Sequence, residues 1–237
     1  MKKNSKVFQF LLTYGIVIFL ILLYAFFSVS APNFFTTKTL ITILKQVSIN
    51  GIVAIGMGFV MICGGIDLST SAVVALVNVV FCKLYVGNIT GIPAIVICLM
   101  VGCTIGLFNA FVVNTLGVMP MIGTLGAATA IRGIAYIYTQ GIPVSGMPKS
   151  LVSFAQASLG PVPYMVILLL VMFAVAAIIL NKTKFGRHVY AVGGNAEAAR
   201  LSGINMMKVK YTCYIISGAC AAIAGMVLSS RTNSGQP

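Results

Sequence analysis

The chain has 237 residues, of which 59% are hydrophobic and 7% are charged, and its formal net charge is +13. Soluble domains carry about 25% charged residues, so this composition excludes an ordinary soluble domain and indicates an integral membrane protein. The basic residues are spread between apolar runs and do not gather on one soluble face, which argues against nucleic acid as a partner. Their distribution is instead that of membrane orientation signals.

Long apolar segments recur along the chain, and a membrane-spanning helix needs about 20 mainly apolar residues. Seven segments approach this length and predict an all-α, polytopic transmembrane helix bundle. They are Phe8–Phe27, Gln46–Cys63, Thr70–Val86, Ile92–Val113, Met119–Tyr138, Tyr164–Leu180 and Val209–Leu228. The second and third are short and are separated by a Gly-Gly pair, which predicts broken helices. The first is long enough to span and no small-residue cleavage site follows it, so we expect it to remain as a helix.

The Lys and Arg residues near the helix ends predict the orientation of the bundle. With the N-terminus in the cytoplasm, six crossings place the loop Asn181–Lys210 inside. This loop holds six basic residues and the N-terminus three, out of fifteen in the chain. The basic residues on the other side are fewer and scattered, and Thr139–Pro163 is the longest predicted external loop.

The cysteines and the single histidine give no indication of a metal site. Six cysteines lie in or beside apolar runs without a CxxC spacing, and His188 is the only histidine. Buried, small hydrophobic side chains are the favoured interpretation of the cysteines, over metal ligands or disulfides. No Walker A sequence occurs. We therefore expect neither a catalytic residue nor ATP hydrolysis by this chain.

Asp67 is one of only two acidic residues and lies in "GGIDLSTSAVVAL", between two predicted spans. Gly64 and Gly65 can interrupt a helix, and Asp67 or Ser69 can then cap the next one by accepting hydrogen bonds from its first free N–H groups. In a second interpretation, a broken helix at membrane depth lines a cavity, because irregular backbone exposed to lipid is not tolerated. The two interpretations are compatible.

Other polar residues lie within the predicted spans. Arg132 precedes the outer end of its span by about six residues, so it either snorkels to the interface or makes a polar contact within the bundle. Asparagine side chains usually bond between helices, and they also suit a neutral, hydroxyl-rich substrate. The candidate substrate-path residues are Asn50, Gly64, Gly65, Asp67, Ser69, Asn78, Asn109 and Arg132.

A second polar island, "GGNAEAARLSGIN", lies between the sixth and seventh predicted spans. Asn195 suits the N-cap position, and Ala196–Leu201 are good helix formers. Glu197 falls in the first turn and Arg200 near the end, where each charge suits the helix dipole, and Gly203 ends the helix. These rules predict a short, capped helix at the cytoplasmic surface. It is either an interfacial linker or a docking element for a soluble partner.

Several separated blocks resemble one family. "EAARLSG" resembles the EAA-x-x-x-G loop of ATP-binding-cassette importer permeases, and "KFGRHVYAVGGN" resembles the segment that precedes it in the sugar branch. "GGIDLSTSAVVAL" and "GTLGAATAIRGIAYIYTQGIPV" are similar to the GGIDLS signature and the TLG…RG…G-P block of that branch. The chain thus resembles permeases for ribose, galactose, xylose and other simple sugars, including the autoinducer-2 type. Permeases for branched-chain amino acids and nucleosides are more distant relatives.

The resemblance implies a permease subunit of a binding-protein-dependent importer, which brings a monosaccharide such as ribose into a bacterium through its plasma membrane. It implies a single permease domain, residues 1–237, with a cytoplasmic coupling loop at 181–208. The implied partners are an ATPase subunit that carries ATP and Mg, an extracytoplasmic sugar-binding protein, a second permease subunit in a homodimer, and membrane lipid. This chain would itself bind no cofactor. The implied coupling residues are Arg187, Gly194, Asn195, Glu197, Ala198, Ala199, Arg200 and Gly203.

Two features depart from the family pattern. The EAA motif of some importers continues to a distal Leu-Pro, which is absent from "MMKVKYTCY". The resemblance implies about ten spans, against seven predicted here, so we expect a chain that is incomplete at its C-terminus and lacks part of the substrate path. Two alternatives remain at this point. One is a secondary transporter with Asp67 as its ion or proton site, and the other is an inactive permease fragment.

Overall fold

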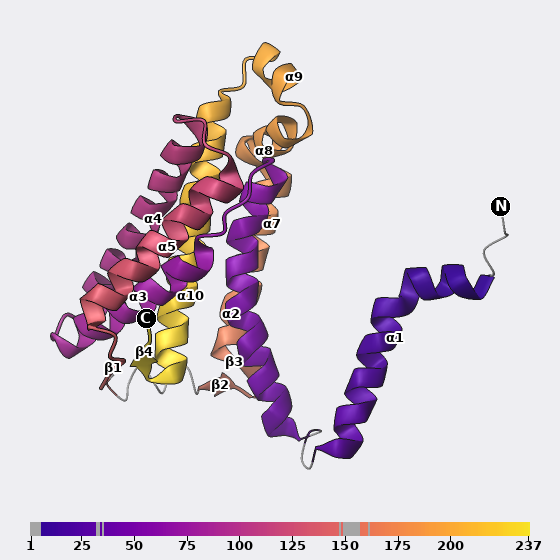
Figure 1. Ribbon diagram of the computed structural model, residues 1–237, viewed down its shortest axis with the longest axis vertical. Helices are drawn as coiled ribbons and strands as arrows, with labels where there is room; N and C mark the ends of the chain where they lie inside the picture. The colour runs from indigo at the N-terminus through magenta and orange to yellow at the C-terminus, as the bar shows by residue number, and fades with distance from the viewer. Residues whose placement is uncertain (1–5, 32–33, 35, 147, 149–156, 161) are drawn as a thin grey trace. The chain divides into compact units, whose positions relative to one another are not determined.

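The computed structural model describes residues 6–31, 34, 36–146, 148, 157–160 and 162–237. They form two compact units, Met1–Leu44 and Lys45–Pro237, which are described separately. Helices dominate both units (Figure 1) and are α1 Lys6–Ser30, α2 Thr37–Ile62, α3 Thr70–Val86, α4 Ile92–Asn114, α5 Pro120–Thr139, α7 Tyr164–Lys182, α8 Lys184–Gly194, α9 Ala196–Leu201 and α10 Met206–Thr232. The short strands are β1 Val144–Ser145, β2 Ser158–Leu159, β3 Val162–Pro163 and β4 Ser234–Gly235.

The first unit consists of α1 and the start of α2. Within α1, the apolar segment Thr13–Ser30 is entirely unburied. Aromatic rings pack where α1 ends, since the Tyr24 and Phe34 rings lie 5.2 Å apart and those of Phe27 and Phe34 lie 5.8 Å apart. The exposed apolar side chains of Thr13–Ser30 suit contact with lipid.

Each of the seven predicted spans coincides with a helix, and the prediction of an all-α bundle is confirmed. Among the described residues, α1, α2, α4, α7 and α10 are long and apolar enough to cross a membrane. Helix α3 has 17 residues and is shorter, because the chain is not helical between Cys63 and Ser69. Helix α5 has 20 residues but contains Arg132 and several Gly, Ala and Thr residues, which make it less apolar than the others.

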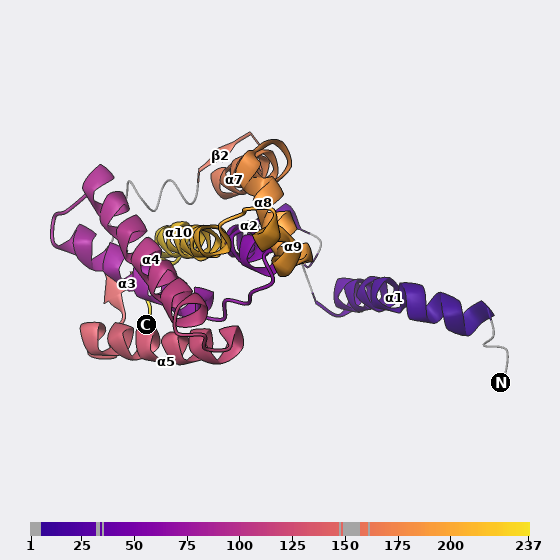
Figure 2. The ribbon, with the colours of Figure 1, turned by 90° about the horizontal axis from the view of Figure 1, so that it is seen from above.

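Helix α10 is the centre of the second unit, where α4 lies on one side of it and α2 on the other (Figure 2). Glycines allow this packing. A Cβ added at Gly102 of α4 would overlap the backbone of Gly218 in α10, and one added at Gly106 would overlap the Tyr214 carbonyl. Gly102 and Gly106 have the small-xxx-small spacing that brings membrane helices close together.

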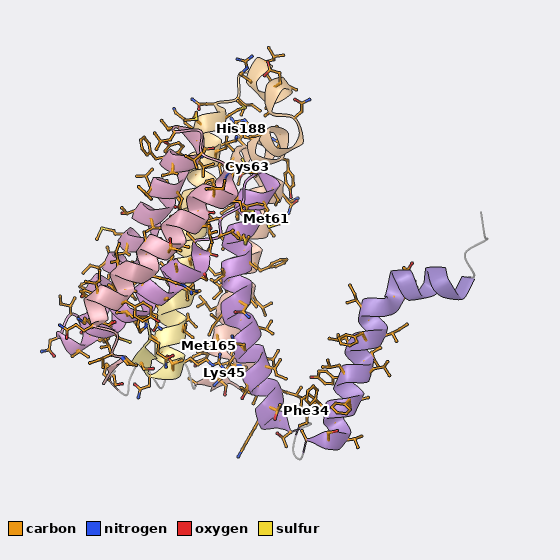
Figure 3. The ribbon with its side chains drawn as sticks, viewed as in Figure 1. Phe34, Lys45, Met61, Cys63, Met165 and His188 are labelled. Atoms are coloured by element: carbon orange, nitrogen blue, oxygen red, sulfur yellow. The ribbon has the colours of Figure 1, made fainter. Side chains whose placement is uncertain are left out.

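The two ends of the second unit differ. Helices α8 and α9 lie at one end, and the strand pairs lie at the other (Figure 1). Strand β1 pairs antiparallel with β4, and β2 with β3. Lys45 and Met165 lie near the strand end, whereas Cys63 and His188 lie near the α8–α9 end (Figure 3). The predicted cytoplasmic loop and the predicted external loop are therefore at opposite ends of the helices, as the predicted order of crossings requires.

Candidate functional site

The first feature of the site is the break between α2 and α3. Gly64 has a φ of +83°, Gly64 N donates to Met61 O at 3.0 Å, and Gly65 N donates to Val60 O at 2.9 Å. This pair of bonds around a left-handed glycine is the Schellman ending of a helix. The predicted helix interruption at Gly64 and Gly65 is thus observed, and the chain continues in non-helical form until α3 begins at Thr70.

Asp67 lies within the break and is 1% exposed. Its Oδ1 accepts from Ser69 N at 3.0 Å and from Ser69 Oγ at 2.6 Å, and its Oδ2 accepts from Ser217 Oγ of α10 at 2.9 Å. The capping prediction needs a correction. Ser69 is the N-cap of α3 but its side chain accepts no capping bond; its hydroxyl donates to Asp67 and accepts from Asn109 instead. Asp67 accepts the N–H of Ser69 and so forms an Asx turn before the helix.

Asn109 of α4 completes this arrangement. Its Nδ2 donates to Ser69 Oγ at 2.6 Å and lies 3.5 Å from Asp67 Oδ1, while its buried Oδ1 has no partner among the described residues. We call Asp67, Ser69, Asn109 and Ser217 the polar cluster. The residues come from the break, the start of α3, α4 and α10. A buried carboxylate must be hydrogen-bonded or paired, and here hydroxyl and amide donors satisfy it.

Backbone groups of the break also form hydrogen bonds with side chains of neighbouring helices. Leu68 N donates to Thr124 Oγ1 of α5 at 3.1 Å, and Tyr214 OH of α10 donates to Ile66 O at 3.3 Å. Thr124, Tyr214 and Ser217 were not predicted from the sequence. The spacing of Tyr214 and Ser217, three residues apart on one face of α10, is the signal that could have found the last two.

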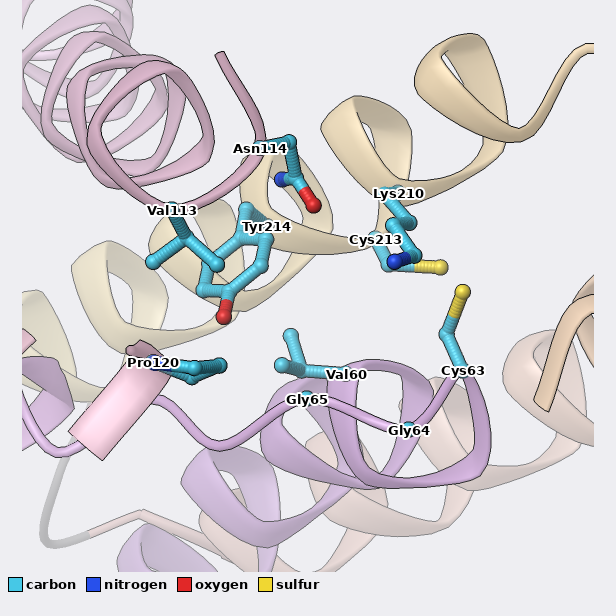
Figure 4. Close-up of a pocket in the computed structure, with 10 residues that line it drawn as sticks. All are labelled: Val60, Cys63, Gly64, Gly65, Val113, Asn114, Pro120, Lys210, Cys213 and Tyr214. Carbon is cyan, nitrogen blue, oxygen red and sulfur yellow. The ribbon is translucent and has the colours of Figure 1, made fainter. Parts of the chain in front are cut away.

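A small cavity lies beside the break, between α2, α4 and α10 (Figure 4). The thiols of Cys63 and Cys213 point toward one another there, and Lys210 and Tyr214 also line it. Its volume is about 30 Å³, which is room for one or two water molecules. A sugar does not fit in it.

The remaining substrate-path candidates lie elsewhere. Asn50 is exposed on α2. Asn78 of α3, with its amide turned to satisfy both partners, donates to Ser234 O and accepts from Gln236 N, each at 3.2 Å, so it holds the backbone around β4. Arg132 is exposed on α5 and has no hydrogen-bond or ion-pair partner among the described residues. The structure therefore brings together Asp67, Ser69 and Asn109 alone of the predicted polar side chains.

The second feature is the loop that precedes α10, which begins with α8. Thr183 caps this helix by accepting from Gly186 N at 3.1 Å, and Val189 and Val192 are buried. Helix α8 was not predicted, although the apolar spacing of Phe185, Val189 and Val192 is helical. Gly194, predicted as a coupling residue, is the last residue of α8, and Arg187 is exposed on the same helix.

Helix α9 has the local structure that its sequence predicts. Asn195 Oδ1 accepts from Ala198 N at 3.0 Å, and Glu197 pairs with Arg200 at 2.6 Å. At the other end Gly203 has a φ of +77°, with Gly203 N bonded to Arg200 O and Ile204 N to Ala199 O, which is again a Schellman ending. Ala199 is 4% exposed, whereas Leu201 is 79% exposed. The helix is thus capped at both ends and rests on Ala199.

Comparisons with known proteins agree with this architecture. The family described as branched-chain amino acid transport system / permease component matches residues 39–237. The ribose import permease protein of Haemophilus influenzae is 36% identical over 99% of this chain and 74% of its own length, and that of Bacillus subtilis is 34% identical over 89% and 66%. The D-allose transport system permease protein of Escherichia coli is 33% identical over 99% and 73%. The chain thus spans 66% to 74% of the length of these relatives. No solved structure matches it.

Proposed function

Because the chain belongs to the family of branched-chain amino acid transport system permease components, we propose that it is the membrane-spanning permease subunit of an ATP-driven importer for a simple sugar. The permeases named for ribose and D-allose, at 33% to 36% identity, support a monosaccharide as the substrate class. The chain's own contribution is a multi-pass helical path. Binding and hydrolysis of ATP with Mg belong to a separate ATPase subunit, so this chain holds no cofactor.

Helix α9 carries the proposal. It is a rigid element, because Asn195 and Gly203 fix its two ends and Ala199 anchors it from below. Leu201, 79% exposed, is an apolar knob that a groove on the ATPase can receive. The coupling loop, residues 181–208, holds five Lys and Arg residues, Arg200 of α9 among them, and Glu197 is its only acid. A helix held between α8 and α10 transmits movement to both, provided that the ATPase binds its two positions with different affinity.

Helix α5 supports a second permease subunit as a partner. Thr129, Arg132, Gly133 and Tyr136 are exposed and share one face of this helix, by their helical spacing. A charged and polar face is costly against lipid at membrane depth. A second copy of the chain facing it would enclose a polar path between the two subunits, with Arg132 in reach of a hydroxyl-rich substrate.

The proposed orientation follows from charge. The loop at the α8–α9 end carries six of the fifteen basic residues and the N-terminus three, so both are cytoplasmic by the positive-inside rule. The strand end then faces outward, where an extracytoplasmic sugar-binding protein delivers substrate. The polar cluster does not favour an ion-coupled transporter, because protein donors already occupy both oxygens of Asp67. Ion-driven sugar uptake into vesicles without ATP would contradict the importer.

The function is tested by co-purification of this chain with the ATPase subunit that the proposal requires. The substitution Glu197→Lys reverses a charge on the exposed face of α9, and we expect it to weaken co-purification of the ATPase at least tenfold. Thr90→Lys is the control, because Thr90 is exposed at the strand end of the unit. If Glu197→Lys binds the ATPase as tightly as the control, and deletion of residues 194–203 also leaves binding intact, the assignment of α9 is wrong.

A further inference from the structure

Two adjacent glycines at the end of α8 have opposite surroundings. A Cβ added at Gly193 would overlap the carbonyl oxygen of Ile62 and lie 3.3 Å from the Cα of Cys63, whereas a Cβ added at Gly194 meets nothing within 4 Å. Ile62 is the last residue of α2, so its carbonyl lacks the helical partner that earlier residues have. The backbone of α8 therefore rests directly on the end of α2, at a place where only glycine fits.

Helices α8 and α9 are joined into one body. Asn195 is both the C-cap of α8 and the N-cap of α9. Val192 of α8 and Ala199 of α9 share one apolar cluster with Phe59 and Cys63 from the end of α2. The Phe59 ring also stacks on Phe185 of α8 at 6.4 Å. Displacement of α9 by a docked partner would thus be passed to the last turn of α2.

Beyond this contact the chain enters the break. Cys63 follows Ile62 directly, and Gly64 turns the chain at a φ of +83°. Four residues after Cys63, Asp67 is bound to Ser217 of α10. A shift of the end of α2 must therefore either move the break with it or strain the bonds of the polar cluster.

We propose that Gly193 is a positioning residue for energy coupling, and that its backbone contact with Ile62 carries movement of α9 into the break that holds Asp67. This inference rests on the proposed function, since it requires an ATPase that moves α9. Side-chain packing alone could hold α8 in place, but a backbone contact transmits displacement without the slack of a rotating side chain. Gly193 is the residue that permits it.

The test uses proteoliposomes that contain this chain, its ATPase and its sugar-binding protein. Gly193→Ala pushes α8 off the end of α2, and Gly58→Ala, one turn before Ile62 in α2, is the matched control because a Cβ at Gly58 meets nothing within 4 Å. We expect Gly193→Ala to keep ATPase association and hydrolysis within twofold of wild type, and to lower the sugar molecules transported per ATP at least tenfold. Gly58→Ala should equal wild type. Equal transport per ATP in both variants overturns the inference.

A second measurement covers the case in which Gly193→Ala fails to assemble. In the wild-type complex, labelling of Cys63 by a maleimide is followed by peptide mass spectrometry, with and without vanadate-trapped nucleotide. We expect the labelling rate to change at least threefold, because Cys63 is 5% exposed and moves with Ile62. An unchanged rate overturns the inference. Absence of ATP-dependent uptake by the wild type would instead contradict the proposed function, which keeps the two failures distinct.

Discussion

The only two carboxylates of the chain, Asp67 and Glu197, occupy opposite environments. Glu197 is 64% exposed by its side chain and pairs with Arg200 three residues away. Asp67 is 1% exposed and is held by residues 2, 42 and 150 positions away in the sequence. The first carboxylate belongs to a structure made by local rules, and the second to one that exists only when four segments have packed.

This difference predicts how stability is distributed. An exposed ion pair contributes about 0 to 1 kcal/mol, because water solvates both charges well before they pair. A buried polar group that loses its partner costs about 1 to 3 kcal/mol. Substitutions in the polar cluster should therefore affect the whole fold, and substitutions in α9 should affect local order and partner binding.

The largest effect is expected for Asp67→Ala. It leaves the Ser69 N–H and the Ser69 and Ser217 hydroxyls without their common acceptor, at a total cost on the order of 3 kcal/mol or more. Denaturation in mixed micelles measures the loss of free energy of unfolding. Asp67→Asn is the control, since it keeps an acceptor oxygen and should cost less than half as much. Equal stability of Asp67→Ala and wild type would show that the buried carboxylate does not hold the break.

The next largest effect on the free energy of unfolding is expected for Ser217→Ala. It removes the hydrogen bond that joins Asp67 Oδ2 to α10, and we expect a loss of about 1 to 2 kcal/mol in the same measurement. Ser229→Ala is the matched control for Ser217→Ala. Ser229 is equally buried in α10, but its hydroxyl donates to Met226 O of its own helix. That control should change stability by about 0.5 kcal/mol or less. A control that costs as much as Ser217→Ala would mean that the loss reflects packing of α10 and not the polar cluster.

Asn195→Ala should have a smaller and local effect. Loss of the cap bond to Ala198 N costs α9 about 1 kcal/mol, and amide hydrogen exchange at Ala198 should accelerate about fivefold while global stability is unchanged. Asn205→Ala removes an equivalent bond, to Lys208 N at the start of α10, and should leave exchange at Ala198 as in wild type. Unchanged exchange in Asn195→Ala would indicate that packing of Ala199 alone keeps α9 folded.

The same contrast explains what could be predicted from the sequence. Apolar run lengths located the seven long helices, and capping rules located α9, because both depend on neighbours within a few residues, whereas α8 was missed. The Gly64–Gly65 break was also predictable, since two adjacent glycines lower helix propensity and readily supply the left-handed residue that ends a helix. The hydrogen bonds of Asp67 could not be predicted. A serine at position 217 is unremarkable within an apolar helix until α10 is placed beside the break. The contact of Gly193 with Ile62 depends on packing in the same way.

Glu197→Gln should have the smallest effect on stability. It neutralises an ion pair whose two side chains are 63% and 64% exposed, and we expect a change of about 0.5 kcal/mol or less in the free energy of unfolding. Arg200→Gln breaks the same pair from the other side and should match it. If both variants fold as wild type while Glu197→Lys loses the ATPase, the charge at this position acts on a partner. A loss of stability comparable to that of Ser217→Ala would instead make Glu197 a structural residue, and the comparison between the two carboxylates would no longer hold.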